Sequence, residues 1–182
     1  MEDRSKEFER IYQSVQRDLY VYIIRSVRNE DLAKDILQDS FVNFMKAFRV
    51  KELPPDVNSR MYIFRIARHL IINNSRSASI RKTTSVPDTD SFSDLDNKNL
   101  PESEILTNDS KNEISDLLYD LLDELKEEER TAVILKHIQN MKLSDIAEIL
   151  DTSVATASRF VHRGMDNLMS IVERKGLKIG EY

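Results

Sequence analysis

Apolar residues recur every three or four positions along most of this 182-residue chain, and this spacing constrains the fold more than any other feature. Residues three or four apart lie on one face of an α-helix, so each recurring set predicts an amphipathic helix. The chain also has only three Gly and four Pro, which leaves little material for the tight turns that join β-strands. These patterns together predict an all-α fold.

The predicted helices fall into two groups that a polar stretch separates. In the first group, helices are expected over residues 5–27, 31–48 and 59–76. In the second group, one helix is expected to start near residue 113, one to cover residues 127–138, and two short ones to lie within residues 143–163. The stretch between the groups is rich in Ser, Thr, Asp and Asn, and it has too few apolar residues to offset the entropy of ordering it. We therefore predict two small helical domains, 1–76 and 113–182, joined by a flexible acidic linker over 77–112.

Several classes of function have no supporting pattern. The absence of Cys excludes disulfides and thiolate metal sites, and His69, His137 and His162 lie far apart in the sequence. No phosphate-binding glycine loop or nucleophile motif occurs. No apolar run approaches the roughly 20 residues of a membrane span, and the charged N-terminus does not resemble a secretory signal. We expect a cytoplasmic protein that is not an enzyme, with no metal, cofactor, small-molecule substrate or membrane insertion.

The formal net charge of −5 hides a strongly basic segment. Residues 60–82 contain six Arg or Lys and no acid, and the helical period places Arg65, Arg68, His69 and Arg76 opposite the apolar face. Such a face can be simply solvated, but helix surfaces of that kind normally mix charges of both signs. A basic face points equally to contact with nucleic acid.

Residues 143–163, LSDIAEILDTSVATASRFVHR, predict a helix-turn-helix. Ala147 is small enough for two helices to cross closely. Asp151 stands at the turn position that commonly needs a left-handed backbone, for which Asp is tolerated. Ser153 is a good N-cap for the second helix.

The second helix of this motif divides into two faces. Its predicted buried side consists of Val154, Ala157, Phe160, Val161, Gly164 and Leu168. Its predicted exposed side consists of Ala155, Thr156, Arg159, His162 and Arg163. Small, hydroxyl and basic side chains of this kind suit the major groove of DNA. The alternative is a generic amphipathic helical hairpin.

Three separated segments resemble one family, the extracytoplasmic-function sigma factors of the sigma-70 family. They are DLAKDILQDSFVNFMKAF (31–48), YIFRIARHLIINNSR (62–76) and the segment from LDELKEEER to MDNL (122–168). The first segment resembles the polymerase-binding helix of the family's region 2. The second segment resembles the helix that reads and melts the −10 element, and the third segment resembles region 4. The resemblance covers nearly the whole chain outside the linker.

The resemblance implies partners and site residues. Contact with the clamp helices of the largest RNA polymerase subunit is implied for Leu32, Asp35, Gln38, Asp39 and Phe41. Reading and melting of the −10 element is implied for Asn58, Ser59, Tyr62, Arg65, Arg68 and Arg76. Reading of the −35 element is implied for Thr156, Ser158, Arg159, His162 and Arg163. Contact of region 4 with the flap of the second subunit and an anti-sigma factor partner are also implied.

The sequence departs from the family pattern at several of these sites. Tyr62 stands where Trp is usual, His69 where Asn is usual, and Asn73 where Asp is usual. Lys142 stands where a capping Ser is frequent, and Ser158 where Lys or Arg is common. These changes bear on which promoter bases are preferred. Two other functions stay open at this point, namely a stand-alone helix-turn-helix regulator that binds a palindrome as a dimer and a helical adaptor protein.

Overall fold

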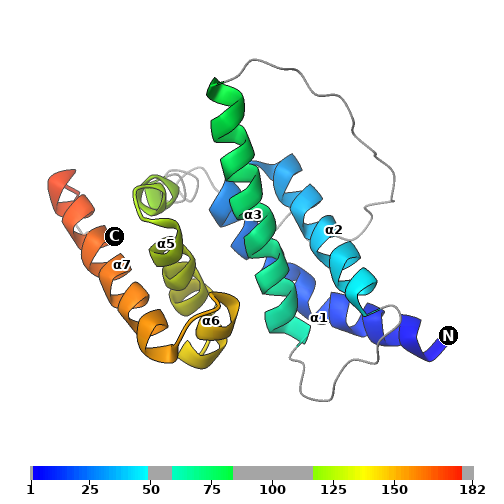
Figure 1. Ribbon diagram of the computed structural model, residues 1–182. Coiled ribbons are helices and arrows are strands. Elements are labelled where there is room, and N and C mark those ends of the chain that lie inside the picture. Colours follow the sequence, from blue (N-terminus) through cyan, green and yellow to red (C-terminus); the bar gives the residue numbers. More distant parts are fainter. Residues whose placement is uncertain (1, 49–58, 84–116, 178–182) are drawn as a thin grey trace.

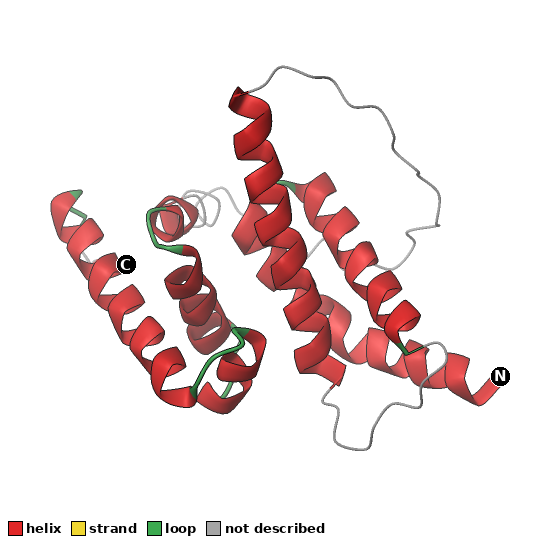
Figure 2. Cartoon of the chain, viewed as in Figure 1, coloured by secondary structure: helices red, strands yellow, loops and turns green. Residues whose placement is uncertain are grey.

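The computed structural model describes residues 2–48, 59–83 and 117–177, which are helices joined by short turns (Figure 1). No strand occurs within those ranges, which confirms the all-α prediction (Figure 2). The elements in chain order are α1 (Glu2–Val27), α2 (Glu30–Ala47), α3 (Ser59–Thr83), helical residues 117–123, α5 (Glu127–Val133), the π-helix η1 (Ile134–Ile138), α6 (Leu143–Ile149) and α7 (Val154–Arg174).

Helices α1, α2 and α3 pack side by side as the first unit (Figure 1). The turn between α1 and α2 places Arg28 in the left-handed region, with φ of 53°. Asn29 then caps α2, because its side chain accepts a 2.8 Å hydrogen bond from the backbone N–H of Leu32. The apolar stripes meet in a core that includes Leu19, Ile23, Ala33, Ile36, Leu37, Phe44, Ile63 and Ala67.

Helix α3 is longer than the sequence predicted. We expected it to end near Arg76, and it ends at Thr83. Residues 77–83, SASIRKT, contain neither Gly nor Pro, so nothing in them forces a helix to stop. The proposed domain limits stay a prediction, because linker residues 84–112 lie outside the described part of the chain.

The second unit contains the predicted helix-turn-helix. Asp151 has a left-handed backbone with φ of 52°, and Ser153 accepts a hydrogen bond from the backbone N–H of Thr156, both as predicted. The predicted helix over 127–138 is present as α5 followed by η1. Its last turn is widened, since the N–H of Gln139 reaches back to the carbonyl of Ile134.

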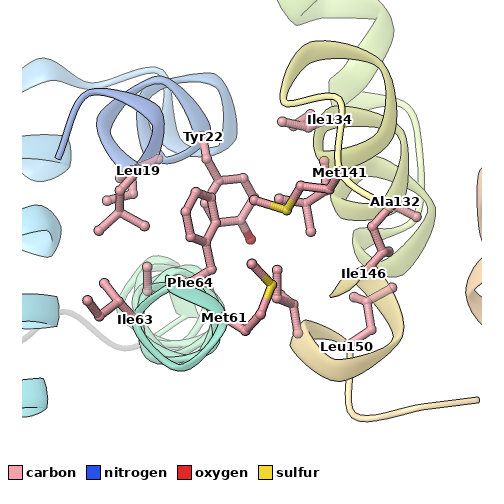
Figure 3. Close-up of a cluster of buried hydrophobic side chains, with 14 of the residues drawn as sticks. Leu19, Tyr22, Met61, Ile63, Phe64, Ala132, Ile134, Met141, Ile146 and Leu150 are labelled. Carbon is pink, nitrogen blue, oxygen red and sulfur yellow. The ribbon is translucent and has the colours of Figure 1, made fainter. Parts of the chain in front are cut away.

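The two units pack against each other, which the sequence did not predict. Figure 3 shows Tyr22 of α1 with Met61 and Phe64 of α3 facing side chains of the second unit. Those facing side chains are Ala132, Ile134, Met141, Ile146 and Leu150, and all of them are buried. The buried residues of both units therefore belong to one continuous apolar cluster.

Tyr22 links this cluster to the pH dependence of stability. Burial raises the pKa of its hydroxyl from 10.0 to about 12, against a smaller lowering effect of the hydrogen bond with Thr131. Because the pKa of Tyr22 is higher in the folded chain than in the unfolded chain, the neutral hydroxyl favours the fold. This contribution to the free energy of unfolding is fully present below pH 10 and is lost as pH rises through about 12.

We therefore expect the free energy of unfolding to fall by about 2 kcal/mol more in the native chain than in Tyr22→Phe as pH rises from 10 to 12. Urea unfolding at a series of pH values measures this difference. Tyr22→Phe keeps the ring and removes the titrating group, so it is the matched control. Equal losses in the two proteins would contradict the prediction.

Candidate nucleic-acid interface

The N-terminal turns of α7 carry a chain of polar contacts on the exposed side of the helix-turn-helix. The hydroxyl of Ser153 lies 3.0 Å from the hydroxyl of Thr156. Thr156 Oγ1 in turn accepts a 2.9 Å hydrogen bond from Nη2 of Arg159. The Arg159 side chain is thus oriented by the residue one turn earlier, while the residue as a whole stays exposed.

One turn further along α7 lie the other predicted contact residues. Nδ1 of His162 lies 2.7 Å from the backbone carbonyl oxygen of Ser158. The Arg163 side chain is 64% exposed, and its Nε is 3.8 Å from a carboxylate oxygen of Glu129. The five residues implied in −35 reading therefore share one helix, with Arg159, His162 and Arg163 exposed and Thr156 and Ser158 half-buried.

The buried side of α7 was predicted correctly in part, since Phe160 and Leu168 are partly buried against the core. Ala157, Val161 and Gly164 are buried. Val154 was expected on this side but is 50% exposed. It is the first residue of α7, directly after the N-cap Ser153.

Helix α3 carries most of the residues implied in −10 reading. Tyr62 packs against Phe44 and Phe48, with ring centroids 6.0 and 5.1 Å away, and remains half-buried. The guanidinium of Arg65 lies 5.5 Å from the Tyr62 ring centroid. Arg76 is exposed, as predicted, and so is His69. Ser59 is the half-buried first residue of α3, whereas Asn58 lies outside the described residues.

Arg68 does not lie on the open basic face where the helical period placed it. It is 9% exposed and makes a two-bonded pair with Glu127, at 3.0 Å from Nε and 2.7 Å from Nη2. The physical reason is the packing of the second unit, which brings the first residue of α5 against α3. The predicted position of Arg68 in solvent was therefore wrong.

The polar face of α2 is open in the structure. Asp35, Gln38 and Asp39 are exposed. Leu32 is half-buried beside them, and Phe41 is buried with its ring centroid 4.6 Å from that of Tyr12. The three polar side chains are accessible to a partner protein, while the buried Phe41 packs α2 against α1 through its contact with Tyr12.

Sequence reasoning missed two acidic residues of α5, Glu127 and Glu129. Glu129 is 2% exposed, and its carboxylate accepts a 2.8 Å hydrogen bond from Nδ2 of Asn167 on α7. A signal was available, because Glu129 stands four residues after Leu125 and three before Ala132 and so falls on the apolar face of its helix. A carboxylate at such a position needs a partner.

Other kinds of site have no support in the described part of the chain. Within residues 2–48, 59–83 and 117–177 no three His, Asp or Glu side chains gather as metal ligands. None of the helices in these ranges is both long and apolar enough to cross a membrane.

Comparison with known proteins bears on both units. The Sigma-70 region 2 profile matches residues 11–80, and the profile of Sigma-70, region 4 matches residues 115–168. The ECF RNA polymerase sigma factor SigX of Bacillus subtilis is 23% identical over 91% of this chain and 84% of its own length. RNA polymerase sigma factor YlaC of the same organism is 26% identical over 85% and 86%.

A solved structure has the same fold. It is the sigma factor RpoE from Bartonella quintana, solved in complex with the anti-sigma factor NepR. The match has 18% sequence identity and a TM-score of 0.66, and it covers 92% of this chain and 98% of the solved chain. The region 2 profile matches the first unit and the region 4 profile matches the second unit, and the structure packs these two units together. The chain belongs to the sigma-70 family and is a sigma factor of the extracytoplasmic-function group.

Proposed function

We propose that this protein binds RNA polymerase core through α2 and selects promoters through two separate DNA contacts, α7 for the −35 element and α3 for the −10 element. The observation that carries the proposal is the exposed face of α7, where Arg159 is held by Thr156 at the start of a recognition helix. The polymerase catalyses RNA synthesis, and the sigma factor contributes binding energy and specificity.

At the −35 element α7 enters the major groove of duplex DNA. Arg159 and Arg163 supply guanidinium donors that match the O6 and N7 acceptors of guanine. Thr156 and Ser158 supply hydroxyls for bases or phosphates. Because Ser158 is neutral, this position adds no charge attraction for a phosphate. Preference for guanine is assigned to Arg159 and Arg163.

At the −10 element α3 meets the opened strand. Unstacking a base costs a few kcal/mol, and stacking on an aromatic side chain returns roughly 1–3 kcal/mol per base. Tyr62 is the half-buried aromatic residue that can accept a base, whereas Phe64 is fully buried and belongs to the core. Arg65 beside Tyr62 and Arg76 further along supply positive charge for the backbone of the strand.

The polymerase contact is assigned to the open polar face of α2. Asp35, Gln38 and Asp39 present carboxylates and an amide on one exposed side of the helix, which suits a basic, amide-rich partner surface. Region 4 would contact the flap of the second subunit. An anti-sigma factor is also proposed as a partner, because a protein of the same fold was solved with one.

Transcription by core polymerase on a promoter library tests the proposal. We expect specific start sites with the native chain. Arg159→Ala is expected to weaken binding to upstream duplex by about 1–3 kcal/mol and to relax specificity at one base pair. The matched control is Arg174→Ala, which removes the same charge from the far end of α7, where Glu124 keeps a second partner in Lys175.

Two results would overturn the proposal. One is the absence of core binding and start-site selection. The other is tight binding of a palindromic duplex by the chain alone, which is the behaviour of a stand-alone regulator. Equal effects of Arg159→Ala and Arg174→Ala would remove the −35 role from Arg159.

A further inference from the structure

A single buried carboxylate lies beside the exposed face of the recognition helix α7. Glu129 of α5 is 2% exposed, and its side-chain partners among the described residues are two residues of α7. One carboxylate oxygen accepts a 2.8 Å hydrogen bond from Nδ2 of Asn167, and the other lies 3.8 Å from Nε of Arg163. These two residues are four positions apart, so they share one side of the helix. The carboxylate therefore meets α7 at a residue that is proposed to read guanine.

Stability alone does not explain a carboxylate at this position. Glu129 shares its helix face with the buried apolar residues Leu125 and Ala132. Burying an anion removes its hydration, and apolar residues of similar volume often replace buried ion pairs without loss of stability. Asn167 is exposed, so water can satisfy its amide in place of Glu129. What the carboxylate provides, and an apolar side chain cannot, is a fixed negative charge beside Arg163.

The ion pair engages Arg163 at the inner end of its guanidinium. A guanidinium has one N–H on Nε, next to the aliphatic stem, and two N–H groups on each Nη at the outer end. Glu129 approaches Nε, and within the described part of the chain neither Nη nitrogen has a hydrogen bond or ion pair. The side chain is 64% exposed. The outer pair of nitrogens is therefore left for the O6 and N7 acceptors of a guanine.

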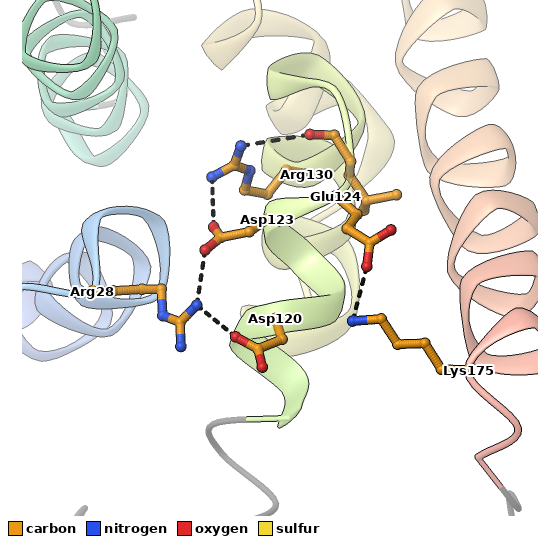
Figure 4. Close-up of polar contacts among 7 residues, drawn as sticks. Arg28, Asp120, Asp123, Glu124, Arg130 and Lys175 are labelled. Carbon is orange, nitrogen blue, oxygen red and sulfur yellow. Dashed lines mark hydrogen bonds and ion pairs between the residues drawn. The ribbon is translucent and has the colours of Figure 1, made fainter. Parts of the chain in front are cut away.

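A second carboxylate contacts α7 at a different place. Glu124 lies in the turn before α5, and Figure 4 shows it with Lys175, whose Nζ is 2.8 Å from one of its oxygens. Glu124 also pairs with Arg174. These pairs hold the C-terminal end of α7, about three helical turns from Arg163. Glu129 differs from Glu124 because it lies beside the recognition residues themselves.

We propose that Glu129 is a positioning residue for −35 recognition, which orients the Arg163 guanidinium so that its two Nη nitrogens meet a guanine. This inference rests on the proposed function, because it concerns how α7 reads the same promoter element. A guanidinium that is oriented in advance loses less conformational entropy when it binds the base. Glu129 thereby adds affinity and specificity without contacting DNA.

The sign of the charge on Glu129 makes this inference testable. Removal of an anion from a DNA-binding surface reduces the repulsion of phosphates, so general electrostatics predicts tighter binding for Glu129→Gln. A positioning role predicts weaker binding, because the Gln side chain has nearly the same shape but no charge to attract the guanidinium. The two explanations thus predict changes of affinity in opposite directions.

The first experiment uses holoenzyme, assembled from core polymerase and the full chain, on promoters with each base pair in turn at every −35 position. We expect Arg163→Ala to remove a preference for guanine at one position. Glu129→Gln is expected to reduce that same preference by about fivefold and to weaken promoter binding, with the other positions unchanged. Glu124→Gln is the matched control, because it removes the same charge and a contact with α7, and it should change promoter binding less than about twofold.

A double variant separates positioning from a general loosening of the helix. If Glu129 acts through Arg163, Glu129→Gln should change promoter binding less than about twofold in the Arg163→Ala background. A carboxylate that only stabilised the packing of α5 on α7 would cost the same affinity in both backgrounds and at every −35 position. That result would overturn the inference, and so would equal or tighter promoter binding by Glu129→Gln alone.

Glu129→Met keeps the test valid if Glu129→Gln does not fold. Methionine fills a similar volume and adapts to apolar neighbours. In urea unfolding of the full chain we expect this variant to be at least as stable as the native protein. Its holoenzyme should nevertheless lose guanine preference at the Arg163 position. A stable Glu129→Met variant with the native preference would contradict the positioning role.

These measurements distinguish this inference from the proposed function. If holoenzyme with the native chain selects no promoter, the proposed function fails. If native holoenzyme selects promoters, and Arg163→Ala removes a guanine preference that Glu129→Gln and Glu129→Met retain, the −35 role of α7 stands. In that case only the positioning role of Glu129 is refuted.

Discussion

Phe64→Ala is expected to lower the free energy of unfolding by about 3–5 kcal/mol, the range for deletion of a buried aromatic side chain. Phe64 is fully buried, its ring centroid is 5.5 Å from that of Tyr22, and the Arg60 guanidinium lies 5.4 Å from it. Figure 3 places it where α1, α3 and the second unit meet. Truncation leaves a cavity that rigid helices on three sides cannot close.

Thermal unfolding of the full chain measures this loss. For a chain of this size each kcal/mol shifts the midpoint by roughly 2–4 °C, so a decrease of about 10 °C is expected. Tyr62→Ala is the matched control, since Tyr62 lies two residues earlier on α3 and is only half-buried.

Tyr62→Ala should cost less stability and yet reduce open-complex formation, because Tyr62 is proposed to stack on a base. Phe64→Ala should show the opposite order of effects. If the two substitutions destabilise the chain equally, the assignment of Phe64 to the core and Tyr62 to DNA is wrong.

The faces of single helices could be predicted because they follow from the helical period alone. The exposed side of α7 was predicted from angles of 100° per residue, and Arg159, His162 and Arg163 are exposed there. Asp151 and Ser153 have the predicted backbone and capping roles, because turn and cap chemistry depends on neighbours in the sequence. Helix faces, turns and caps could therefore be predicted, because each depends on residues within a few positions of one another in the sequence.

Arg68 shows where local rules fail. The helical period correctly turned it away from Ala67 and Ile63, but the period cannot show that another element covers the polar side. Its partner Glu127 lies 59 residues away in the sequence, beyond an acidic stretch. A two-bonded pair with a carboxylate is what allows a guanidinium to be buried there.

The contact between the units was missed for the same reason. Met61 lies in α3 and Met141 between η1 and α6. Nothing in their spacing separates a domain's own core from an interface between two domains. Methionine side chains fill irregular gaps, which suits a surface that has to close against another unit. Both are buried in the same cluster. The fold class could be derived from the sequence, whereas the packing of the two units against each other depends on pairing of surfaces that only the structure shows.

Glu129 shows how a polar residue on an apolar face can be structural and still bear on function. Its carboxylate holds Asn167 at 2.8 Å and lies 3.8 Å from Nε of Arg163, so one buried anion touches two residues of the recognition helix. The close approach of α5 and α7 that makes these contacts possible depends on a residue without a side chain at the crossing. That residue is Gly164.

Gly164→Val is expected to destabilise the chain by about 3 kcal/mol or more, at the upper end of the cost of overpacking a core. A Cβ at this position lies 2.6 Å from Cγ2 of Val133 and 3.2 Å from the backbone carbonyl oxygen of Glu129. The carbonyl belongs to α5 itself and cannot move aside, so α7 has to tilt away from α5.

Gly164→Ala separates sterics from helix propensity. Propensity alone favours Ala over Gly inside a helix by about 1 kcal/mol. The contact with Val133 opposes this gain, and because Val133 is itself buried, we expect net destabilisation in urea unfolding. Val133→Ala removes the clashing methyl group, so the double variant should be more stable than the sum of the single effects predicts, by about 0.5–3 kcal/mol.

Upstream duplex binding gives the second measurement for Gly164. A tilt of α7 moves Arg159 and Arg163 together relative to the DNA, so Gly164→Ala should weaken duplex binding even at temperatures where the chain stays folded. Val133→Ala combined with it should restore part of that binding, because α7 can then return to its position on α5. Additive losses of stability together with unchanged duplex binding would show that the α5–α7 crossing tolerates a side chain and that Gly164 is not what sets the position of the recognition helix.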